Sequence, residues 1–307
     1  MRLGIDLGGT KIEIIALDEG REILRERVAT PQSTYRDTVI AMRDLVVAAE
    51  AKIGRRGSVG VAIPGTISPL SGLVKNANST RLIGHPLDRD LAAALQREVR
   101  VANDANCFVL SETTDGAASG ADIVFGIIVG TGCGGGICVG GRALTGAHAI
   151  TGEWGHNPLP GPTRTELAIS PSCYCGRTNC VEAWISGTGL EADYARRGDH
   201  KLTSHEIADR AAAGNALAAA VMADFHDRFA RAVAGIVNIL DPDVIVIGGG
   251  LSNIATLYTE LPPRVESYAF TPEGRTRIVK NQHGDSSGVR GAAWLWSAEE
   301  AAALLEK

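Results

Sequence analysis

The sequence predicts an α/β fold built from two related halves with a cleft between them, and three observations support this prediction. The 307-residue chain is long for one hydrophobic core and comfortable for two. Apolar runs typical of strands alternate with segments of helical spacing. A hairpin with a glycine-rich turn occurs at residues 2–18 and again at residues 125–139, which indicates repetition of a whole supersecondary unit.

The first half opens with "RLGIDLGGTKIEIIALD", in which two apolar strands flank a polar Gly-Gly turn. "SVGVAIPG" is typical of a buried strand that ends at Pro64 and Gly65, and "VRVANDANC" predicts a strand that leads into a helix. Further elements are expected where apolar residues recur at helical spacing. The predicted helices are 38–53, 87–98 and one that ends near 118.

The second half repeats the plan with a strand at 125–129, a glycine-rich turn at 130–136 and a strand at 137–139. Helices are expected at 187–197, 204–213 and 216–240, followed by the buried strand of "PDVIVIGGG", another helix, a strand at 277–280 and a terminal helix from 289. We expect domains 1–118 and 119–288, with a metal-binding loop at 156–182. The helix at 289–305 is expected to pack back on the first domain.

Composition and charge narrow the class of partner. The net charge is −5 and 45% of residues are apolar, which argues against nucleic acid or an anionic membrane as a partner. The N-terminus does not resemble a signal peptide, and the longest apolar run is interrupted by glycines. A cytoplasmic protein is therefore expected. Thiols stay reduced there, which favours metal binding over disulfides for clustered cysteines.

The glycine-rich turns are candidate phosphate cradles, because glycine lets backbone N–H groups approach phosphate oxygens closely. A carboxylate at the end of the first strand is suited to hold Mg²⁺. The alternative is that these are tight turns with no ligand. The candidate nucleotide residues are Asp6, Gly8, Gly9, Thr10, Thr131, Gly132, Gly248, Gly249 and Gly250, with Lys11 as a weaker contact.

Neither turn has the pattern of a Walker A loop or leads directly into a helix as a Rossmann turn does. A duplicated hairpin that handles phosphate is instead typical of the actin/hexokinase type of fold, a duplicated ribonuclease H-like architecture. The sequence resembles the ROK family of bacterial sugar kinases in "GIDLGGTK", "IPG", "NDAN", "GTGCGGG", "GEWGH", "CYCGRTNCVE" and "DPDVIVIGGG". Within that family, "VKNANST", "ANDANC" and "HGDSSGVRGAAWLW" look most like the fructokinase/mannokinase branch.

Asp104 is the candidate catalytic base. Phosphoryl transfer to a sugar hydroxyl needs a carboxylate within hydrogen-bond reach of that hydroxyl, and Asp104 stands at the predicted end of a strand. The alternative is that Asp104 only caps the helix that follows. The family resemblance implies the catalytic role.

The resemblance also implies a set of sugar ligands. Asn103 and Asp104 would contact the hydroxyl to be phosphorylated, and Glu153, His156 and Glu182 would hold the far side of the ring. The full set of expected sugar-binding residues is Pro64, Gly65, Asn78, Asn103, Asp104, Glu153, His156 and Glu182. Asn76 competes with Asn78 for this role, and either could be a turn residue.

Cys173, Cys175 and Cys180 with His156 fit a tetrahedral Zn²⁺ site. Unliganded thiols or a disulfide are the alternatives. The ROK family carries a clip of approximate form C-x-C-G-x-x-G-C, and here Asn179 stands where that pattern has its last glycine. Four protein ligands would leave no open position, so we assign zinc a structural role. The cysteines Cys107, Cys133 and Cys138 are interpreted as packing residues.

The expected function is an ATP- and Mg²⁺-dependent hexose kinase that phosphorylates the 6-hydroxyl of D-fructose. Mannose, glucose or N-acetylglucosamine are alternative acceptors. A sugar-sensing regulator of the same family is an alternative of another class, although the first strand begins too early to leave room for a preceding DNA-binding domain. A zinc-ribbon module fits the C-x-C spacing poorly. The resemblance also implies a homodimer.

Overall fold

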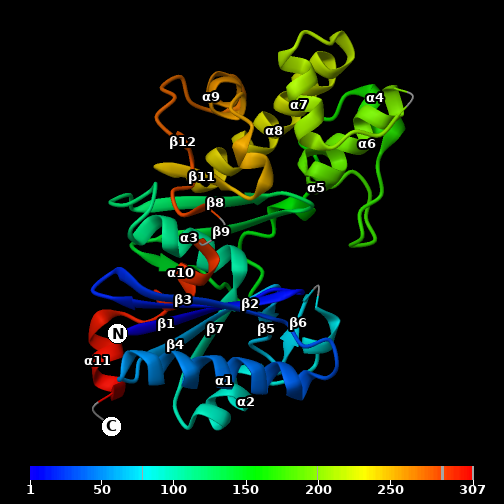
Figure 1. The fold of residues 1–307 in the computed structure, drawn as a ribbon. Helices are drawn as coiled ribbons and strands as arrows, with labels where there is room; N and C mark the ends of the chain where they lie inside the picture. Colours follow the sequence, from blue (N-terminus) through cyan, green and yellow to red (C-terminus); the bar gives the residue numbers. More distant parts are fainter. Residues whose placement is uncertain (78, 199, 285–286, 306–307) are drawn as a thin grey trace. The chain divides into compact units, whose positions relative to one another are not determined.

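The structure is a computed structural model that describes residues 1–77, 79–198, 200–284 and 287–305. It is a mixed α/β fold (Figure 1). Residue contacts divide the chain into two compact units. The first comprises Met1–Ser119, Gly141–Thr151 and Asp285–Lys307, and the second comprises Gly120–Gly140 and Gly152–Gly284. The grouping of Gly141–Thr151 with the first unit was not among the expected boundaries.

The first unit is a sheet with helices on both faces. Its sheet has the order β3-β2-β1-β4-β7, in which β1 is antiparallel to β2 and parallel to β4. Helices α1 and α2 lie on one face of this sheet, and α3 and α10 lie on the other (Figure 1). The strands are β1 (Arg2–Leu7), β2 (Lys11–Asp18), β3 (Arg21–Ala29), β4 (Ser58–Ile63), β5 (Thr66–Ile67), β6 (Val74–Lys75), β7 (Val99–Asn103) and β10 (Arg142–Ala143), and the helices are α1 (Tyr35–Ile53), η1 (Thr80–Leu82), α2 (Leu87–Leu95), α3 (Asp104–Thr114), α10 (Ser287–Ala293) and α11 (Ala298–Leu305).

Two strand glycines let α10 lie directly on the sheet. A Cβ on Gly4 would stand 2.1 Å from the Val289 carbonyl oxygen, and one on Gly60 would stand 1.8 Å from that of Ala292. No side chain fits there, so the backbone of α10 contacts β1 and β4 without an intervening layer. Sequence periodicity alone could not show which face of the sheet this C-terminal helix covers.

The second unit repeats the arrangement of the first. Its own strands have the order β9-β8-β11-β12, with β8 antiparallel to β9 and parallel to β11. Helices α8 and α9 cover one face (Figure 1). The strands are β8 (Ile123–Val129), β9 (Cys133–Val139), β11 (Val244–Gly248) and β12 (Arg277–Lys280), and the helices are η2 (Trp154–His156), α4 (Arg164–Ile169), α5 (Glu182–Ile185), α6 (Gly187–Arg197), α7 (Ser204–Ala212), α8 (Ala216–Leu240), η3 (Gly250–Asn253) and α9 (Leu257–Tyr268).

The two sheets share one connectivity, because β2-β1-β4-β7 has the same sense and order as β9-β8-β11-β12. The repeated hairpin of the sequence is the antiparallel pair at the start of each sheet. Long α8 supplies a stripe of buried residues, including Val221, Phe225 and Phe229, to the core of the second unit. Each half therefore has its own core, as the length of the chain predicted.

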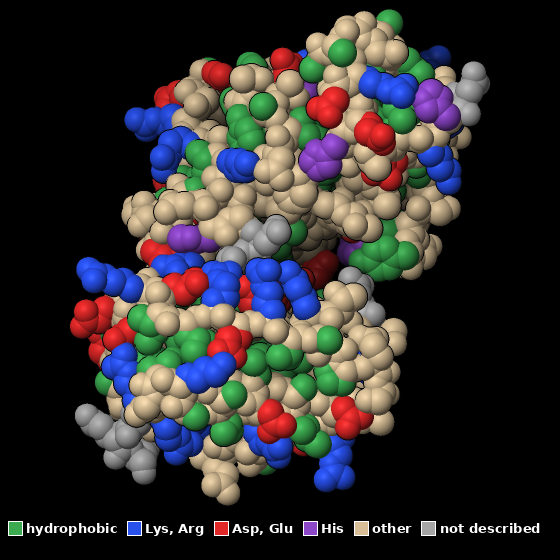
Figure 2. Space-filling view, viewed as in Figure 1, with side chains coloured by type: hydrophobic (Ala, Val, Ile, Leu, Met, Phe, Trp, Pro, Cys, Tyr) green, Lys and Arg blue, Asp and Glu red, His purple; other side chains and the backbone are tan. Residues whose placement is uncertain are grey.

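No helix among the described residues is both long enough and apolar enough to cross a membrane. Basic and acidic side chains lie interspersed on the face shown in Figure 2. In β3, for example, Arg25 and Arg27 pair with the buried carboxylate of Glu13 at 2.7 and 2.8 Å.

Candidate functional site

Asp6 lies near the end of β1, where it pairs in register with Glu13 of β2. The pKa of its carboxyl is raised to about 6 by desolvation, and the negative charges of Asp104 and Glu13 add to the effect while Lys11 opposes it. The structure therefore couples Asp6 and Asp104 electrostatically, although 97 positions of sequence lie between them. At neutral pH Asp6 is ionised and suited to a hard cation such as Mg²⁺.

The first glycine-rich turn is braced by Thr30 and Gln32, which directly follow β3. The Thr30 hydroxyl donates to the Gly8 carbonyl at 2.8 Å, and the Gln32 amide donates to the Gly9 carbonyl at 3.0 Å. The Gly8 N–H donates to the Lys11 carbonyl at 3.0 Å, which closes the turn. These two side chains hold the carbonyls of the turn. Nothing in the local sequence around Thr30 and Gln32 predicts this role.

Asn103 and Asp104 stand where β7 passes into α3. The Asn103 side chain is the N-cap: its oxygen accepts from the Ala105 N–H at 2.9 Å, and its amide donates to the Gly65 carbonyl at 3.2 Å. Asp104 is the first residue of the helix, and it accepts from the Ala105 N–H at 2.8 Å. The alternative in which Asp104 is the N-cap is wrong, because Asn103 fills that position.

Gly65 follows Pro64 at the end of β4 and has a φ of +152°. A Cβ there would stand 2.8 Å from the Lys75 carbonyl oxygen, so only glycine allows this close approach. The approach puts the Gly65 carbonyl against Asn103. Lys11 begins β2 with an exposed side chain. The predicted sugar ligand Asn78 lies outside the described residues.

The second glycine-rich turn is held by residues after the cysteine loop. Its Gly130 carbonyl accepts from the Gly187 N–H at 2.6 Å, and its Thr131 carbonyl accepts from the Thr188 hydroxyl at 2.6 Å. A Cβ on Gly132 would stand 2.8 Å from a carboxylate oxygen of Glu182. The predicted phosphate turn and the predicted sugar ligand Glu182 therefore contact each other within this unit.

Gly248 ends β11 beside the same turn, Gly249 follows it, and Gly250 begins η3. A Cβ on Gly249, whose φ is +82°, would stand 2.4 Å from the Val129 carbonyl oxygen, and one on Gly130 would stand 3.7 Å from the Gly250 nitrogen. The glycine-rich turns of this unit thus meet at adjacent strand ends, where open α/β sheets usually bind ligands.

The expected turn at 130–136 is too long, since β9 begins at Cys133. The glycines of "GEWGH" allow close packing against β9. A Cβ on Gly152 would stand 2.2 Å from the Gly135 carbonyl oxygen, and one on Gly155 would stand 2.3 Å from that of Cys133. The segment with Glu153 and His156 is therefore laid directly on the strand.

His156, Cys173, Cys175 and Cys180 come together, and their ligand atoms all lie within 4.8 Å of one another. Tetrahedral Zn²⁺ with Zn–S bonds of about 2.3 Å sets its ligands roughly 3.3–3.8 Å apart. The Cys173 sulfur lies 3.5 Å from Nδ1 of His156, and the Cys175 and Cys180 sulfurs are 3.7 Å apart. This spacing fits a metal and is too long for a disulfide. The donor set is the soft thiolate and imidazole set that suits Zn²⁺.

The thiol ligands differ in environment. Hydrogen bonds from the backbone and side chain of Arg177 lower the pKa of the exposed Cys175 thiol to about 6, while burial raises that of Cys180 to about 12. The Cys173 thiol lies 3.8 Å from a carboxylate oxygen of Glu182, whose other oxygen accepts from the Cys133 N–H at 2.8 Å. Glu182 therefore lies between the His156–cysteine cluster and the second turn.

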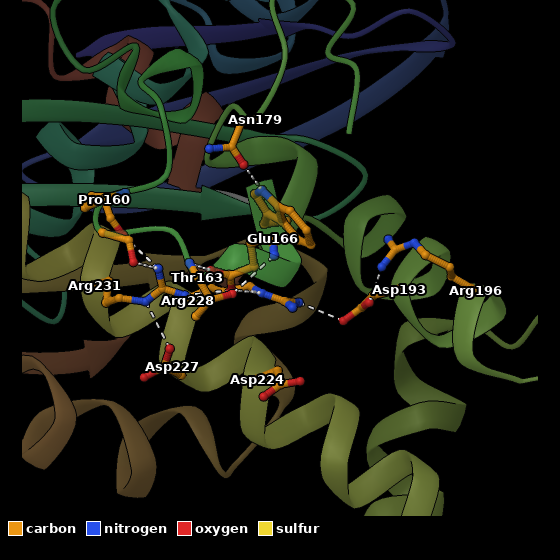
Figure 3. A network of polar contacts seen from close by, with 12 residues as sticks. Pro160, Thr163, Glu166, Asn179, Asp193, Arg196, Asp224, Asp227, Arg228 and Arg231 are labelled. Atoms are coloured by element: carbon orange, nitrogen blue, oxygen red, sulfur yellow. Dashed lines mark hydrogen bonds and ion pairs between the residues drawn. The ribbon is translucent and has the colours of Figure 1, made fainter. Parts of the chain in front are cut away.

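The long insert between His156 and Cys173 is anchored by a buried ionic network (Figure 3). Glu166 of α4, 4% exposed, accepts from Arg228 and Arg231 of α8, each at 2.7 Å. Arg228 also donates to Asp193 of α6 at 2.7 Å, and Arg231 donates to the Pro160 carbonyl at 2.7 Å. The insert is thus tied to the core by side chains far along the sequence, and α4 was not predicted.

Asn179 has left-handed backbone with a φ of +60° and is buried. Its side-chain oxygen accepts from the indole N–H of Trp184 at 2.8 Å, and Arg228 stacks over the Trp184 ring at 4.3 Å. Asn179 therefore supplies the backbone shape that glycine would supply, and adds a hydrogen bond that glycine cannot make.

The duplicated sheets, the paired glycine-rich turns and the acidic residues at the first of them define an actin-like sugar kinase. Comparison with known proteins agrees. A ROK hexokinase from Thermus thermophilus has a TM-score of 0.85 with this chain at 30% identity, covering 95% of this chain and 96% of that one. A ROK family glucokinase from Streptomyces griseus, in complex with glucose and AMPPNP, has a TM-score of 0.75 at 26% identity, covering 96% and 98%.

The chain belongs to the ROK family, whose model matches residues 2–299. An N-acetyl-D-glucosamine kinase of Yersinia pseudotuberculosis is 41% identical over 304 residues, which are 98% of this chain and 100% of that protein. The expected family and fold are therefore confirmed, and the protein is a sugar kinase.

Proposed function

We propose that this protein transfers the γ-phosphoryl group of ATP to the 6-hydroxyl of a hexose. The observation that carries the proposal is the pair Asp6 and Asp104, two carboxylates brought into electrostatic contact at the carboxyl ends of β1 and β7. One suits a metal–nucleotide complex and the other suits a hydroxyl nucleophile. The Streptomyces griseus glucokinase, which holds glucose and AMPPNP, supports the same reaction class.

Asp104 is the proposed base. Its carboxylate accepts the proton of the attacking hydroxyl as the oxygen–phosphorus bond forms, and ADP leaves with the electrons of the broken bond. A moderate base suffices because the transition state is loose and the proton leaves late. Asn103, fixed through Ala105 and Gly65, is the proposed orienting group for the same hydroxyl.

The glycine-rich turns are the proposed phosphate contacts, with backbone N–H groups and the hydroxyls of Thr10 and Thr131 as donors. Asp6 would hold Mg²⁺, directly or through water, and the ion would neutralise charge on the phosphates. We assign the adenosine to the neighbourhood of Gly248–Gly250. Lys11 remains a weaker proposed contact.

Glu153, His156 and Glu182 are the proposed ligands for the rest of the sugar, together with Pro64 and Gly65. Zn²⁺ on His156 and the cysteines would fix the loop that carries them and would take no part in the chemistry. The contact between Glu182 and the second turn supports this arrangement, because one carboxylate then links the metal loop to a phosphate turn.

Two acceptors have separate support. N-acetyl-D-glucosamine is the substrate named for the Yersinia relative at 41% identity, and whole-length similarity favours it. D-fructose is supported by the stretches "VKNANST", "ANDANC" and "HGDSSGVRGAAWLW", which resemble the fructokinase branch. N-acetylglucosamine has an acetamido group where glucose has the hydroxyl of its second carbon, so a pocket that hydrogen-bonds the acetamido group discriminates strongly.

A coupled ADP-release assay with a panel of hexoses tests the proposal. We expect turnover with at least one acceptor, ranked by kcat/KM across N-acetylglucosamine, fructose, mannose and glucose. Phosphate at the 6-position is checked by NMR of the product. If the protein binds a sugar but forms no ADP with any of these acceptors, the kinase proposal is contradicted and a sugar-sensing protein is indicated instead. A homodimer is also proposed, and light scattering after gel filtration would measure it.

A further inference from the structure

Arg81 is a partly buried arginine that has no carboxylate partner in the part of the chain that the structure describes. It belongs to the short helix η1, and its guanidinium donates to the side-chain oxygen of Gln32 at 3.0 Å. Arg97 of the same unit, by contrast, pairs with Glu50 at 2.7 Å. The described residues therefore leave the positive charge of Arg81 without a negative partner, and the proposed function gives that charge no role.

Gln32 links Arg81 to the first glycine-rich turn. Its side-chain oxygen accepts from Arg81, while its side-chain nitrogen donates to the Gly9 carbonyl at 3.0 Å and to the Thr30 carbonyl at 2.9 Å. An amide accepts only at its oxygen and donates only at its nitrogen, so these contacts fix which end of the amide faces Arg81. The guanidinium is thus one side chain away from the turn.

The segment that carries Arg81 is also held beside the turn without Gln32. Leu82, the next residue, is 2% exposed and packs into the core of the first unit. Before Arg81, the hydroxyl oxygen of Ser79 lies 3.9 Å from the place where a Cβ on Gly9 would stand. Two separate observations therefore place Arg81 at this turn.

We propose that Arg81 is a further phosphate-binding residue at the first glycine-rich turn, where its guanidinium binds the terminal phosphates of ATP. A guanidinium presents five N–H donors in a planar fork that matches two oxygens of a phosphate, and Gln32 accepts from one of its nitrogens. The backbone N–H groups of the turn and the Thr10 hydroxyl are neutral donors, so Arg81 adds the positive charge that they lack. Contact with phosphate rests on the proposed function of the turn, whereas the contacts through Gln32 do not.

Calorimetric titration of Arg81→Ala with Mg–ATP and with AMP tests the proposal. Loss of a charge-assisted contact should raise the Kd for Mg–ATP about tenfold. The Kd for AMP, which lacks the terminal phosphates, should stay unchanged. Arg81→Lys keeps the charge and loses the planar fork, so its Kd for Mg–ATP should lie between those of the wild type and Arg81→Ala.

Arg89→Ala is the matched control. Arg89 is exposed on α2 of the same unit, and its guanidinium also makes one hydrogen bond to a neutral group, the Gly72 carbonyl, at 3.1 Å. Its removal takes away one positive charge of the unit, as Arg81→Ala does. We expect Arg89→Ala to bind both nucleotides as the wild type does.

Salt dependence separates binding of phosphate from mere support of the turn. If Arg81 binds phosphate, salt should weaken Mg–ATP binding more in the wild type than in Arg81→Ala, because a charge contact is screened. A Kd for Mg–ATP within twofold of the wild type in Arg81→Ala would overturn the proposal. Equal losses of affinity for Mg–ATP and AMP with an unchanged salt dependence would also overturn it, because they would indicate support of the turn alone.

The same titrations keep this proposal distinct from the proposed function. If the wild type binds Mg–ATP but releases no ADP with any sugar, the kinase proposal fails while the role of Arg81 is still measured. If the wild type releases ADP and Arg81→Ala binds Mg–ATP equally well, only the role of Arg81 fails. A wild type that does not bind Mg–ATP would contradict both.

Discussion

The two glycine-rich hairpins have one backbone plan and different chemistry. In the first, "GIDLGGTK" places Asp6 in register opposite Glu13. In the second, "GIIVGTGC" places Ile128 at the corresponding position, opposite Gly134. The first turn is thus an acidic site near the end of a strand, and the second is apolar there.

The residues that hydrogen-bond to the two turns also differ. Side chains of Thr30 and Gln32, close in sequence, brace the first turn. The second is braced by Gly187, Thr188 and Glu182, which follow the cysteine loop. Duplication therefore supplied a common scaffold. The first copy carries Asp6, the candidate Mg²⁺ ligand, and the second is linked through Glu182 to the cysteine loop.

Of the changes considered, Asp104→Asn should have the largest effect, and the effect should be on kcat. Loss of a general base lowers kcat by about 10²–10⁴-fold. The fold and the Kd for ATP should be unchanged, because Asn103 rather than Asp104 caps α3. Stopped-time ADP assays and calorimetric ATP titration measure both. Asp44→Asn on the surface of α1 is the control, and kcat within tenfold of wild type for Asp104→Asn would refute the assignment.

Removal of the proposed Zn²⁺ tests whether the cysteine loop of the second unit supports sugar binding. Since zinc would fix the loop that carries His156 and Glu182, chelation should raise the KM for the sugar by about 10–100-fold and leave that for ATP within about twofold. Metal content is followed by mass spectrometry, and restored zinc should restore the KM. Zinc-free protein with wild-type sugar affinity would show that the loop and the sugar site are independent.

Asp6→Asn tests the acidic character of the first turn through pH. The pKa of Asp6 is raised from 3.8 to about 6, so the folded protein binds more protons than the unfolded chain between these values. Stability should therefore fall as pH rises through this window, by up to about 3 kcal/mol, and the variant should lack that slope. Urea unfolding from pH 4 to pH 7 measures it.

Function should show the opposite trend in the same titration. Ionised Asp6 is the proposed ligand of Mg²⁺, so the affinity of the wild type for Mg–ATP should fall as pH drops through about 6, and Asp6→Asn should bind weakly at every pH. Ile128→Val at the corresponding position of the second hairpin should change neither profile. Equal pH dependence in wild type and Asp6→Asn would contradict the assignment.

Asn179→Gly should have the smallest effect. Glycine suits the left-handed backbone, but it leaves the buried indole N–H of Trp184 without its acceptor, so we expect a loss of about 1 kcal/mol. Asn179→Ala loses the same bond and adds backbone strain, and should be worse. Thermal unfolding of Asn179→Gly and Asn179→Ala ranks the stability of the two variants. A glycine variant as stable as the wild type would mean that the Trp184 contact contributes nothing.

Local patterns predicted most of the fold. The helix expected at 216–240 is α8, and the strand expected at 277–280 is β12, because long apolar stripes and short buried runs are strong signals. Edge strand β3 was not predicted, since its side chains are mostly charged and exposed. Spacing and the family resemblance were enough to group His156 with the cysteines.

What the sequence determined by itself is the set of turns and the residue types that they carry. Glycines, a strand-end carboxylate and closely spaced thiols can be identified as candidate site residues from the sequence alone, because each signal comes from residues that are close in the chain. Tertiary structure decided the partnerships: Asp6 with Asp104, Glu182 with the second turn, and Glu166 with α8. Those contacts join residues far apart in the chain. Burial and Coulomb interactions depend on distance in space, which no local pattern records.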